Sequence, residues 1–335
     1  MRVVRIGLMA LAMTAACLRA GQAETAILGT GSAFAAPIYT KWAEQQKPIT
    51  GIAINYQPSG SSVGQVQVLK GLTDFGASDV PMEDSKLKEA DILQFPTVAG
   101  GYAVIVNLPG IASGQLRLDG PVLADIFMGS IKLWDDARIA SLNPDIALPK
   151  LAISLLYHAG GSGGTYALSR FLAKNSDVWR DKMGVGMTLN WPSGAGVKGS
   201  NGTASTIPMT VGGVGYAEMS YVIANHLATV QIRNRAGRFV LPNADTFAAA
   251  AEYADWAVPN YAVDLTDMPG EQSWPIVTAT FALVPKNPSK AATSNAILQF
   301  FKWAFANGDD AAWSMQFVPL PDKVKTDITK SWVNR

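Results

Sequence analysis

A glycine- and serine-rich segment, residues 157–165, constrains the fold of this chain more than any other stretch. It follows an apolar run over residues 151–156 that predicts a buried strand, and it precedes a helical pattern over residues 166–173. Small residues between a strand and a helix direct several backbone N–H groups at one point, where the positive end of the helix dipole also lies. The segment therefore predicts an anion-binding loop, or else a tight connection whose glycines only turn the chain.

Two earlier loops, residues 29–34 and 58–62, repeat this arrangement, since each follows a predicted strand and precedes a helical pattern. The hydroxyl groups that these three loops offer are those of Ser32, Ser61, Ser62, Ser162 and Thr165. Three such loops in one chain favour a shared oxyanion cradle. Each serine could instead be an ordinary helix cap, with Ser61 or Ser62 as the N-cap of a helix over residues 63–69.

Strands and helices alternate along the rest of the chain, which is typical of α/β folds with mostly parallel sheets. Further strands are expected over residues 95–107, 214–217 and 278–284, and further helices over residues 120–128, 135–142, 244–254, 289–305 and 322–332. The chain of 335 residues is long enough for two α/β domains joined by crossing strands. Ligands of such proteins bind between the domains, at strand C-termini and helix N-termini.

The N-terminal residues have the pattern of a signal peptide. A basic start and an apolar stretch over residues 6–17 precede a small-x-small cleavage site at residues 21–23, so residues 1–23 are expected to be removed. Cys17, the only cysteine, lies inside this segment, and the mature protein would therefore contain no thiol or disulfide. We expect an exported, periplasmic protein, with a form lipid-anchored through Cys17 as the alternative.

Several motifs, in order, resemble those of the periplasmic phosphate-binding proteins that feed the phosphate ABC importer, the PstS family. They lie at residues 29–37, 39–43, 55–57, 60–62, 74–79, 94–97, 132–136, 142–144, 161–163, 213–216 and 274–276. The resemblance runs from about Ala26 to Trp332 and is specific for family and fold.

The resemblance implies a two-lobed periplasmic binding protein of the type II kind, with two mixed, mostly parallel sheets flanked by helices and a hinge between the lobes. Residues 24–107 and 283–335 would form the first lobe, and residues 108–282 the second. The implied function is capture of phosphate and its delivery to the permease and ATPase subunits of an ABC importer, by a monomer without a cofactor. The same fold could instead bind sulfate, arsenate, a phosphonate or a phosphoester, or act as a sensor.

The family's ligand contacts carry over to some positions and not to others. Positions that match are Phe34 (through its N–H), Ser61, Asp79, Ser162 and Gly163. Three candidate contacts depart from the pattern: Ala33 and Gly164 replace threonines, and His158 replaces an arginine that pairs with the site aspartate. The resemblance implies that the aspartate accepts a proton from the anion and so excludes fully ionised sulfate. We hypothesise that His158, as an imidazolium, replaces the arginine; the alternatives are a changed ligand, or a histidine satisfied by a carbonyl.

Other classes of function find little support. The formal net charge of +1 argues against a nucleic-acid or membrane-surface binder. Residues 160–164 formally match the G-x-S-x-G nucleophile elbow of serine hydrolases. The histidine of that motif's triad follows the serine, and only His226 does so here, at what resembles a helix end. Two distant histidines and no cysteine in the mature chain also argue against a metal enzyme. We expect a protein without catalytic activity, with a serine hydrolase using Ser162 as the less favoured alternative.

Overall fold

The structure, a computed structural model, describes residues 26–286 and 291–333. The predicted signal peptide, its cleavage site and Cys17 lie outside these residues. The strands are β1 (Ala26–Gly31), β2 (Ala53–Pro58), β3 (Phe75–Ser78), β4 (Ile92–Asn107), β5 (Arg117–Leu118), β6 (Ser154–His158), β7 (Ala195–Val197), β8 (Gly213–Glu218), β9 (Ala228–Thr229), β10 (Gln231–Arg233), β11 (Phe239–Val240) and β12 (Val277–Pro285). The helices are α1 (Ala36–Thr50), α2 (Ser61–Leu69), α3 (Asp84–Glu89), α4 (Gly120–Phe127), α5 (Ala137–Leu142), α6 (Gly163–Asn175), α7 (Asp177–Lys182), α8 (Gly199–Thr206), α9 (Met219–Ala224), α10 (Ala244–Ala251), α11 (Ala291–Asn307), α12 (Asp309–Ser314) and α13 (Asp322–Val333), with short 3-10 turns η1 (Ile207–Met209) and η2 (Pro259–Tyr261).

The strands form one continuous path in the order β2-β1-β3-β12-β4-β8-β6-β7, with β9 added to β4, and a separate small sheet in the order β11-β10-β5. The outer strands of the path pair in parallel, as expected from the alternation of strands and helices. The central strands β12 and β4 pair antiparallel with their neighbours. The mixed α/β architecture predicted from the sequence is therefore confirmed.

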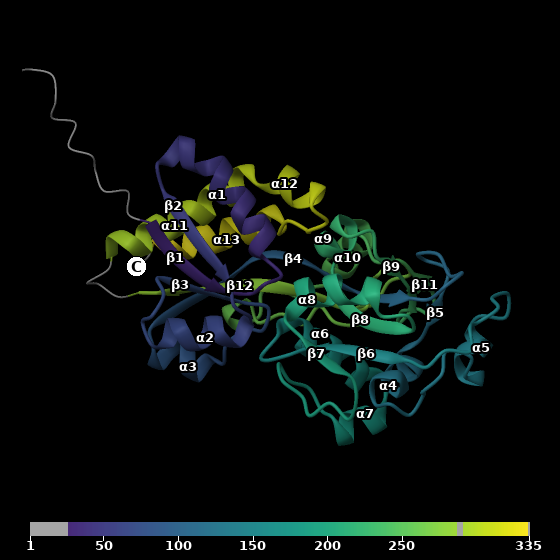
Figure 1. The fold of residues 1–335 in the computed structure, drawn as a ribbon. Coiled ribbons are helices and arrows are strands. Elements are labelled where there is room, and N and C mark those ends of the chain that lie inside the picture. The colour runs from purple at the N-terminus through teal and green to yellow at the C-terminus, as the bar shows by residue number, and fades with distance from the viewer. Residues whose placement is uncertain (1–25, 287–290, 334–335) are drawn as a thin grey trace, which may run out of the picture.

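Strand β4 connects the two halves of this path (Figure 1). Its first part, Ile92 to Gly101, pairs with β12, and its second part, Tyr102 to Asn107, pairs with β8. Fifteen of its sixteen residues are buried, as a strand covered on both faces requires. The halves thus share a strand that changes partner between Gly101 and Tyr102.

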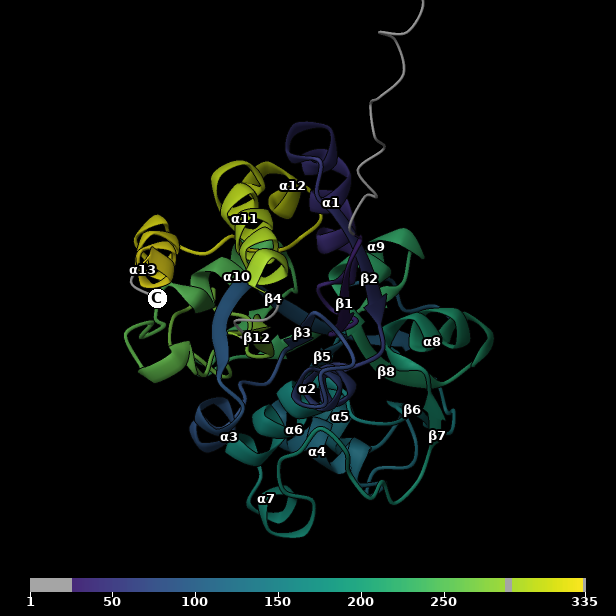
Figure 2. The same cartoon turned by 90° about the vertical axis from the view of Figure 1, so that its left-hand side faces the viewer.

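Helices cover both faces of each half (Figures 1 and 2). In the half that contains β1, β2 and β3, helices α1, α11, α12 and α13 lie on one face, and α2 and α3 lie on the other. Aromatic side chains fill the first of these interfaces: the rings of Tyr39 and Phe75 lie 5.5 and 5.8 Å from that of Phe301, edge-on. This packing holds the C-terminal helices against the first three strands.

The helix after β2 forms where expected, but it turns a different face to the core. Its apolar residues Val66 and Leu69 are 47% and 40% exposed, whereas Gly64 and Val68 are buried. A Cβ on Gly64 would lie 2.5 Å from the carbonyl oxygen of Ala77, so the helix packs on the neighbouring backbone through its glycine. Close backbone contact, rather than the apolar stripe, decides the orientation of this helix.

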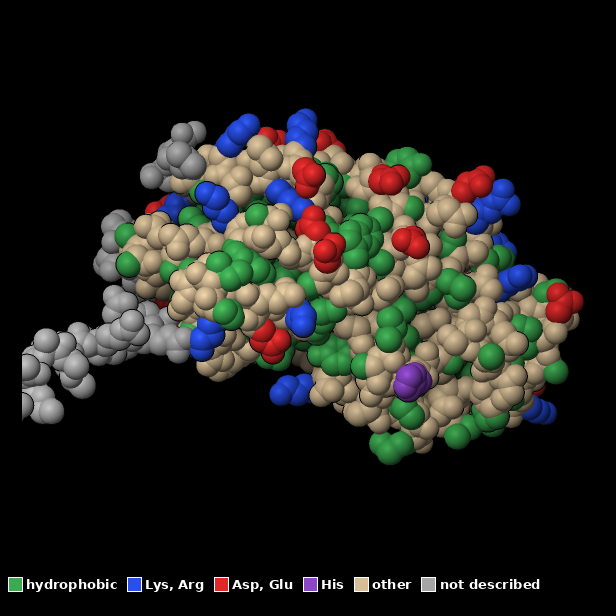
Figure 3. All heavy atoms as spheres, turned by 90° about the horizontal axis from the view of Figure 1, so that it is seen from above, with side chains coloured by type: hydrophobic (Ala, Val, Ile, Leu, Met, Phe, Trp, Pro, Cys, Tyr) green, Lys and Arg blue, Asp and Glu red, His purple; other side chains and the backbone are tan. Residues whose placement is uncertain are grey.

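On the face seen in Figure 3, positively and negatively charged side chains are interspersed, and neither sign forms a separate patch. Among residues 26–286 and 291–333, no helix has both the length and the apolar character needed to cross a membrane.

Candidate functional site

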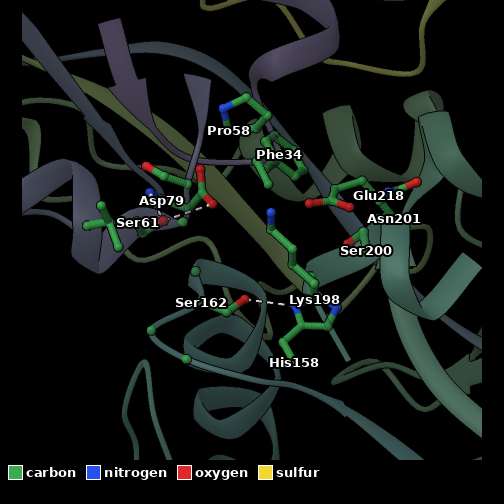
Figure 4. Close-up of a pocket in the computed structure, with 18 of the residues that line it drawn as sticks. Phe34, Pro58, Ser61, Asp79, His158, Ser162, Lys198, Ser200, Asn201 and Glu218 are labelled. Carbon is green, nitrogen blue, oxygen red and sulfur yellow. Dashed lines mark hydrogen bonds between the residues drawn. The ribbon is translucent and has the colours of Figure 1, made fainter. Parts of the chain in front are cut away.

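A cavity of about 280 Å³ lies where the loops after β1, β2, β3 and β6 meet the first turn of α8 (Figure 4). Its lining residues are Ala33, Phe34, Pro58, Ser59, Gly60, Ser61, Val63, Asp79, Tyr102, His158, Ala159, Gly160, Gly161, Ser162, Gly163, Lys198, Gly199, Ser200, Asn201, Glu218 and Tyr221. All three predicted glycine- and serine-rich loops contribute to it. Of the eight candidate ligand contacts, seven line the cavity, and Gly164 does not.

Asp79 is the buried acid of this cavity, with 2% of its surface exposed. Its Oδ1 accepts hydrogen bonds from the hydroxyls of Ser32 (2.5 Å) and Thr280 (2.6 Å). Its Oδ2 accepts longer ones from Ser61 (3.2 Å) and Tyr102 (3.3 Å). Burial raises the pKa of the Asp79 carboxyl, and these four hydroxyl donors oppose the shift. The carboxyl is therefore held by neutral donors, without a cation against it in the described chain.

Ser61 has a different role from the helix cap predicted for it. The residue before α2 with cap geometry is Gly60, which makes no side-chain cap bond. The Ser61 hydroxyl instead accepts from the Asp79 backbone N–H at 3.0 Å and donates to the Asp79 carboxyl. Neither Ser61 nor Ser62 is the N-cap, because the approach of β3 to this loop gives the Ser61 hydroxyl a better partner.

Ser162 is the N-cap of α6, and its Oγ accepts from the backbone N–H groups of Gly164 (3.1 Å) and Thr165 (3.4 Å). The same hydroxyl lies 2.8 Å from Nδ1 of His158 (Figure 4). Since Nε2 of His158 faces the carbonyl oxygen of Tyr216 at 3.1 Å, Nε2 carries the proton and Nδ1 accepts from Ser162. The segment that dominates the sequence is thus both a helix cap and a wall of the cavity.

The hypothesis that His158 is an imidazolium does not agree with this arrangement. His158 is 3% exposed, and burial lowers its pKa to about 4. Its two ring nitrogens are satisfied by one hydroxyl donor and one carbonyl acceptor, which suits the neutral ring. At neutral pH the histidine is therefore uncharged and does not replace the charge of the family's arginine.

Gly164, where the resemblance implies a threonine, makes room for an aromatic ring. A Cβ on Gly164 would lie 2.6 Å from Cε1 of Tyr102. The Tyr102 ring occupies this space and brings its hydroxyl to Asp79. Tyr102 was not predicted as a site residue, since nothing within the apolar run of β4 distinguishes it.

Backbone N–H groups supply most of the free donors in the cavity. Those of Phe34, Ser61 and Gly163 make no hydrogen bond to the protein within the described residues. Thr165, whose hydroxyl is one of those that the three loops offer, is fully buried; its hydroxyl lies 2.7 Å from that of Tyr216 and does not line the cavity. The N-termini of α2 and α6 thus face the same space with unused amides, as the three-loop pattern predicted.

A third helix end, that of α8, was not predicted to take part. Lys198 is the residue before this helix, which has no side-chain cap, and the amides of Gly199, Ser200 and Asn201 bond no protein acceptor in the described chain. In Figure 4 the Lys198 side chain extends from this helix end into the cavity, in the direction of Asp79 and Glu218. Lys198 is the cationic side chain that lines the cavity, and Glu218 is its second carboxyl.

The two sides of the cavity already touch at its base. The backbone N–H of Ser62 donates to the carbonyl oxygen of Gly161 at 3.3 Å. A Cβ on Gly163 would lie 2.3 Å from Oδ2 of Asp79, so only glycine permits this approach. The loops after β2, β3 and β6 are therefore in contact beside the ligand space.

The serine-hydrolase interpretation gains a serine–histidine contact but no complete triad. Ser162 pairs with His158, whose other nitrogen meets a backbone carbonyl rather than a carboxylate. His226 lies exposed after α9 and does not line the cavity. Within the described residues, no group of three or more His, Cys, Asp or Glu side chains could hold a metal ion.

Comparisons with known proteins agree with this geometry. A family model described as "PBP superfamily domain" matches residues 19–307. The "Phosphate-binding protein PstS" of Pasteurella multocida is 43% identical over 312 residues, 93% of this chain and 90% of that protein. The protein of the same name from Xylella fastidiosa is 41% identical, covering 92% of this chain and 85% of the relative.

Solved structures share the fold. A phosphate-binding protein from Stenotrophomonas maltophilia superposes with a TM-score of 0.72 at 19% identity, covering 92% of this chain and 94% of that one. A high-affinity periplasmic phosphate-binding protein solved with phosphate superposes with a TM-score of 0.70 at 20% identity, covering 91% and 93%. These likenesses support the predicted two-lobed fold, and the identity to the curated relatives goes further: this chain belongs to the PstS family of the periplasmic binding proteins.

Proposed function

We propose that this protein binds phosphate between its two lobes and delivers it to an ABC importer. One observation carries the proposal: a buried carboxyl, Asp79, faces a cavity on which the N-termini of α2, α6 and α8 converge. Helix N-termini favour anions, and a carboxyl accepts a hydrogen bond only from an anion that still carries a proton. The names of the curated relatives, phosphate-binding proteins, support the same ligand.

We assign the ligand contacts as follows. Asp79 accepts a hydrogen bond from the P–OH group of monohydrogen phosphate, while the N–H groups of Phe34, Ser61 and Gly163 donate to the other phosphate oxygens. Ser162 and His158 form the opposite side, where the hydroxyl can rotate to the anion once His158 gives up its hydrogen bond. Ala33 contributes no hydroxyl, and Gly164 acts through the space that it leaves for Tyr102.

Lys198 supplies the positive charge that the resemblance assigns to an arginine. Its side chain reaches into the cavity from an exposed position and forms no salt bridge to a described residue. A flexible ammonium group can approach the anion as the lobes close, in the way that hinge-closing binding proteins trap their ligand.

The remaining assignments follow from the family. We place residues 24–107 and 283–335 in one lobe and residues 108–282 in the other; β4 changes its pairing partner within six residues of that boundary. The protein would be exported after removal of residues 1–23, act in the periplasm as a monomer, and present the rims of both lobes to the permease of the importer. It would catalyse no reaction, so a fluorophosphonate probe should leave Ser162 unlabelled.

Titration calorimetry of the purified protein with phosphate, arsenate, sulfate and methylphosphonate tests the proposed ligand. Heat with phosphate and arsenate, and none with sulfate, is the expected result, because sulfate carries no proton for Asp79 at neutral pH. Binding of methylphosphonate or sulfate without binding of phosphate would show that the fold is kept for another anion. Absence of binding to all four would overturn the proposal.

A further inference from the structure

The cavity contains a second buried carboxyl that the proposed phosphate contacts do not use. Glu218 is the last residue of β8, with 2% of its surface exposed, and it lines the cavity together with Asp79. Its Oε2 is fully buried and has no hydrogen-bond partner within the described chain. A buried carboxyl oxygen without a partner is costly, so this atom needs an explanation.

Strand pairing explains where the carboxyl lies. Glu218 is directly opposite Tyr102 in the antiparallel register of β8 and β4. Because the Tyr102 hydroxyl donates to Asp79, the register brings Glu218 to the opposite side of the same ligand space. Figure 4 shows the Glu218 carboxyl directed into the cavity above Lys198 and next to Ser200.

A purely local role does not account for the orphan oxygen. Glu218 precedes α9 as its N-cap residue, yet its side chain makes no cap hydrogen bond. The hydroxyl of Ser200 is also buried and makes no hydrogen bond of standard geometry within the described residues, although it lies near enough to the Glu218 carboxyl to lower the pKa of that group. The unpartnered Oε2 of Glu218, beside the uncapped N-terminus of α8, points to a ligand rather than to capping as its partner.

We propose that Glu218 and the bound phosphate share a proton, with Oε2 of Glu218 and one phosphate oxygen as its two partners. The inference rests on the proposed function and deepens it, since the bound state holds one proton besides the one that Asp79 accepts. When Glu218 is ionised, the proton comes from solvent as phosphate binds, and it lies in an O–H···O bond between the two anions. The hydroxyl of Ser200 and the amides of α8 donate to the same ligand.

The charged and titratable groups around Glu218 agree with this assignment. The hydroxyls of Ser200 and Tyr102 lie near enough to Glu218 to stabilise its ionised form in part, whereas the charge of Asp79 opposes ionisation. The neutral His158 adds no positive charge, and neither do Tyr216 and Tyr221. Burial, reinforced by the charge of Asp79, raises the pKa of Glu218 to about 7. Lys198 is the cationic side chain among the lining residues, and it forms no salt bridge to Glu218 within the described chain. We therefore expect the phosphate dianion to bind beside Glu218 only when a proton lies between the two groups.

Proton uptake measures this directly. Phosphate is titrated into the full mature protein at about pH 8 in two buffers of different ionisation enthalpy, and the difference in heat gives the protons taken up. We expect about one proton per phosphate, and a Kd that rises about tenfold per pH unit between about pH 8 and pH 9.5. Free phosphate remains monohydrogen phosphate over this range, so the change originates in the protein.

Glu218→Gln keeps the shape of the side chain but removes its ability to take up and release a proton. It should bind phosphate without proton uptake and with a Kd that varies little with pH. Glu89→Gln, the same change at an exposed position in α3, is the matched control and should behave as the unmodified protein.

The outcomes separate this inference from the proposed function. Phosphate binding by the unmodified protein without proton uptake would overturn the role of Glu218 and leave the proposed function intact. Unchanged uptake in Glu218→Gln would also overturn it, since the proton would then belong to another group. No phosphate binding at any pH would overturn both. The measurement on the unmodified protein decides the matter even if the variant does not fold.

Discussion

The two sides of the cavity hold their polar groups in different ways. The Asp79 wall, formed by Phe34, Ser61 and Asp79, centres on a carboxyl fixed by four hydroxyl donors. The His158 wall, formed by His158, Ser162, Gly163 and Lys198, centres on a neutral ring and on helix N-termini. Side chains determine which anion the first wall accepts, and backbone amides provide much of what the second wall donates.

The difference between the walls bears on the three positions where the resemblance implies other residues than those present. Two of the three departures, His158 and Gly164, belong to the β6–α6 segment. A wall that donates mainly through its backbone can lose a hydroxyl or a guanidinium and still present N–H groups to an anion. We therefore expect the largest effects from changes that move the backbone of the His158 wall, and smaller ones from changes to its side chains.

Gly163→Ala should have the largest effect on binding. The added Cβ would lie 2.3 Å from Oδ2 and 2.5 Å from Cβ of Asp79, so the two walls must separate. Phosphate binding should weaken by at least about 100-fold, and overpacking should cost about 1–3 kcal/mol of stability. Calorimetry and thermal unfolding measure the two effects.

Gly160→Ala is the control for this change within the same loop. Its Cβ meets open space, so only the positive φ of 78° is unfavourable. It should lose about 1 kcal/mol of stability and keep its affinity. If Gly163→Ala binds phosphate as Gly160→Ala does, the contact between the walls is not required.

His158→Asn tests whether the second wall is neutral. The pKa of about 4 lies below the ordinary value of 6.5, so the unfolded chain binds the proton more tightly and His158 costs stability as pH falls from about 6.5 to about 4. Relative to the variant, the free energy of unfolding of the unmodified protein should fall by about 3 kcal/mol over that pH range. Glu218, whose pKa is raised, changes stability in the opposite direction, and taking the difference between the two proteins removes its contribution.

Denaturant unfolding at several pH values, with the exposed His226→Asn as control, measures this difference. A difference that stays constant with pH would mean that His158 is accessible to protons in the folded state. The imidazolium hypothesis would then regain its basis, and His158→Arg should tighten phosphate binding.

Asp79→Asn tests the selectivity of the first wall. The amide can donate to an anion that carries no proton, whereas the carboxyl cannot when ionised. The ratio of phosphate to sulfate affinity should therefore fall by at least about tenfold. Competition of sulfate against phosphate in calorimetry measures the ratio, with the exposed Asp327→Asn as control. Continued exclusion of sulfate would assign the selectivity to another group, with Glu218 the first to examine.

Lys198→Gln should have the smallest effect, because the ammonium group is exposed and screened. We expect phosphate binding to weaken about threefold to tenfold, and its dependence on salt concentration to become weaker. Lys182→Gln, an exposed lysine in α7, should change neither quantity. Equal effects of the two substitutions would show that Lys198 contributes only to the overall charge of the protein.

Much of this arrangement could be predicted from the sequence, and the parts that could not share a physical reason. The three loops were recognised because strand, small residues and helix follow one another locally. Tyr102, Thr280 and Glu218 were missed, since each lies at a strand position whose meaning depends on the register with a distant strand. Lys198 was missed because the weak helical pattern of α8, rich in glycine and serine, gives no signal of a helix end.

Strand β12 has a consequence for the order in which the protein can form. It lies between β3 and β4 in the sheet, although nearly two hundred residues of chain separate it from β3. Thr280, whose hydroxyl donates to Asp79, also lies on β12. During synthesis the first two hundred and seventy or so residues thus lack the strand that joins β3 to β4. The half of the sheet that begins the chain can be completed only near its end, which favours slow, late folding of a nearly whole polypeptide.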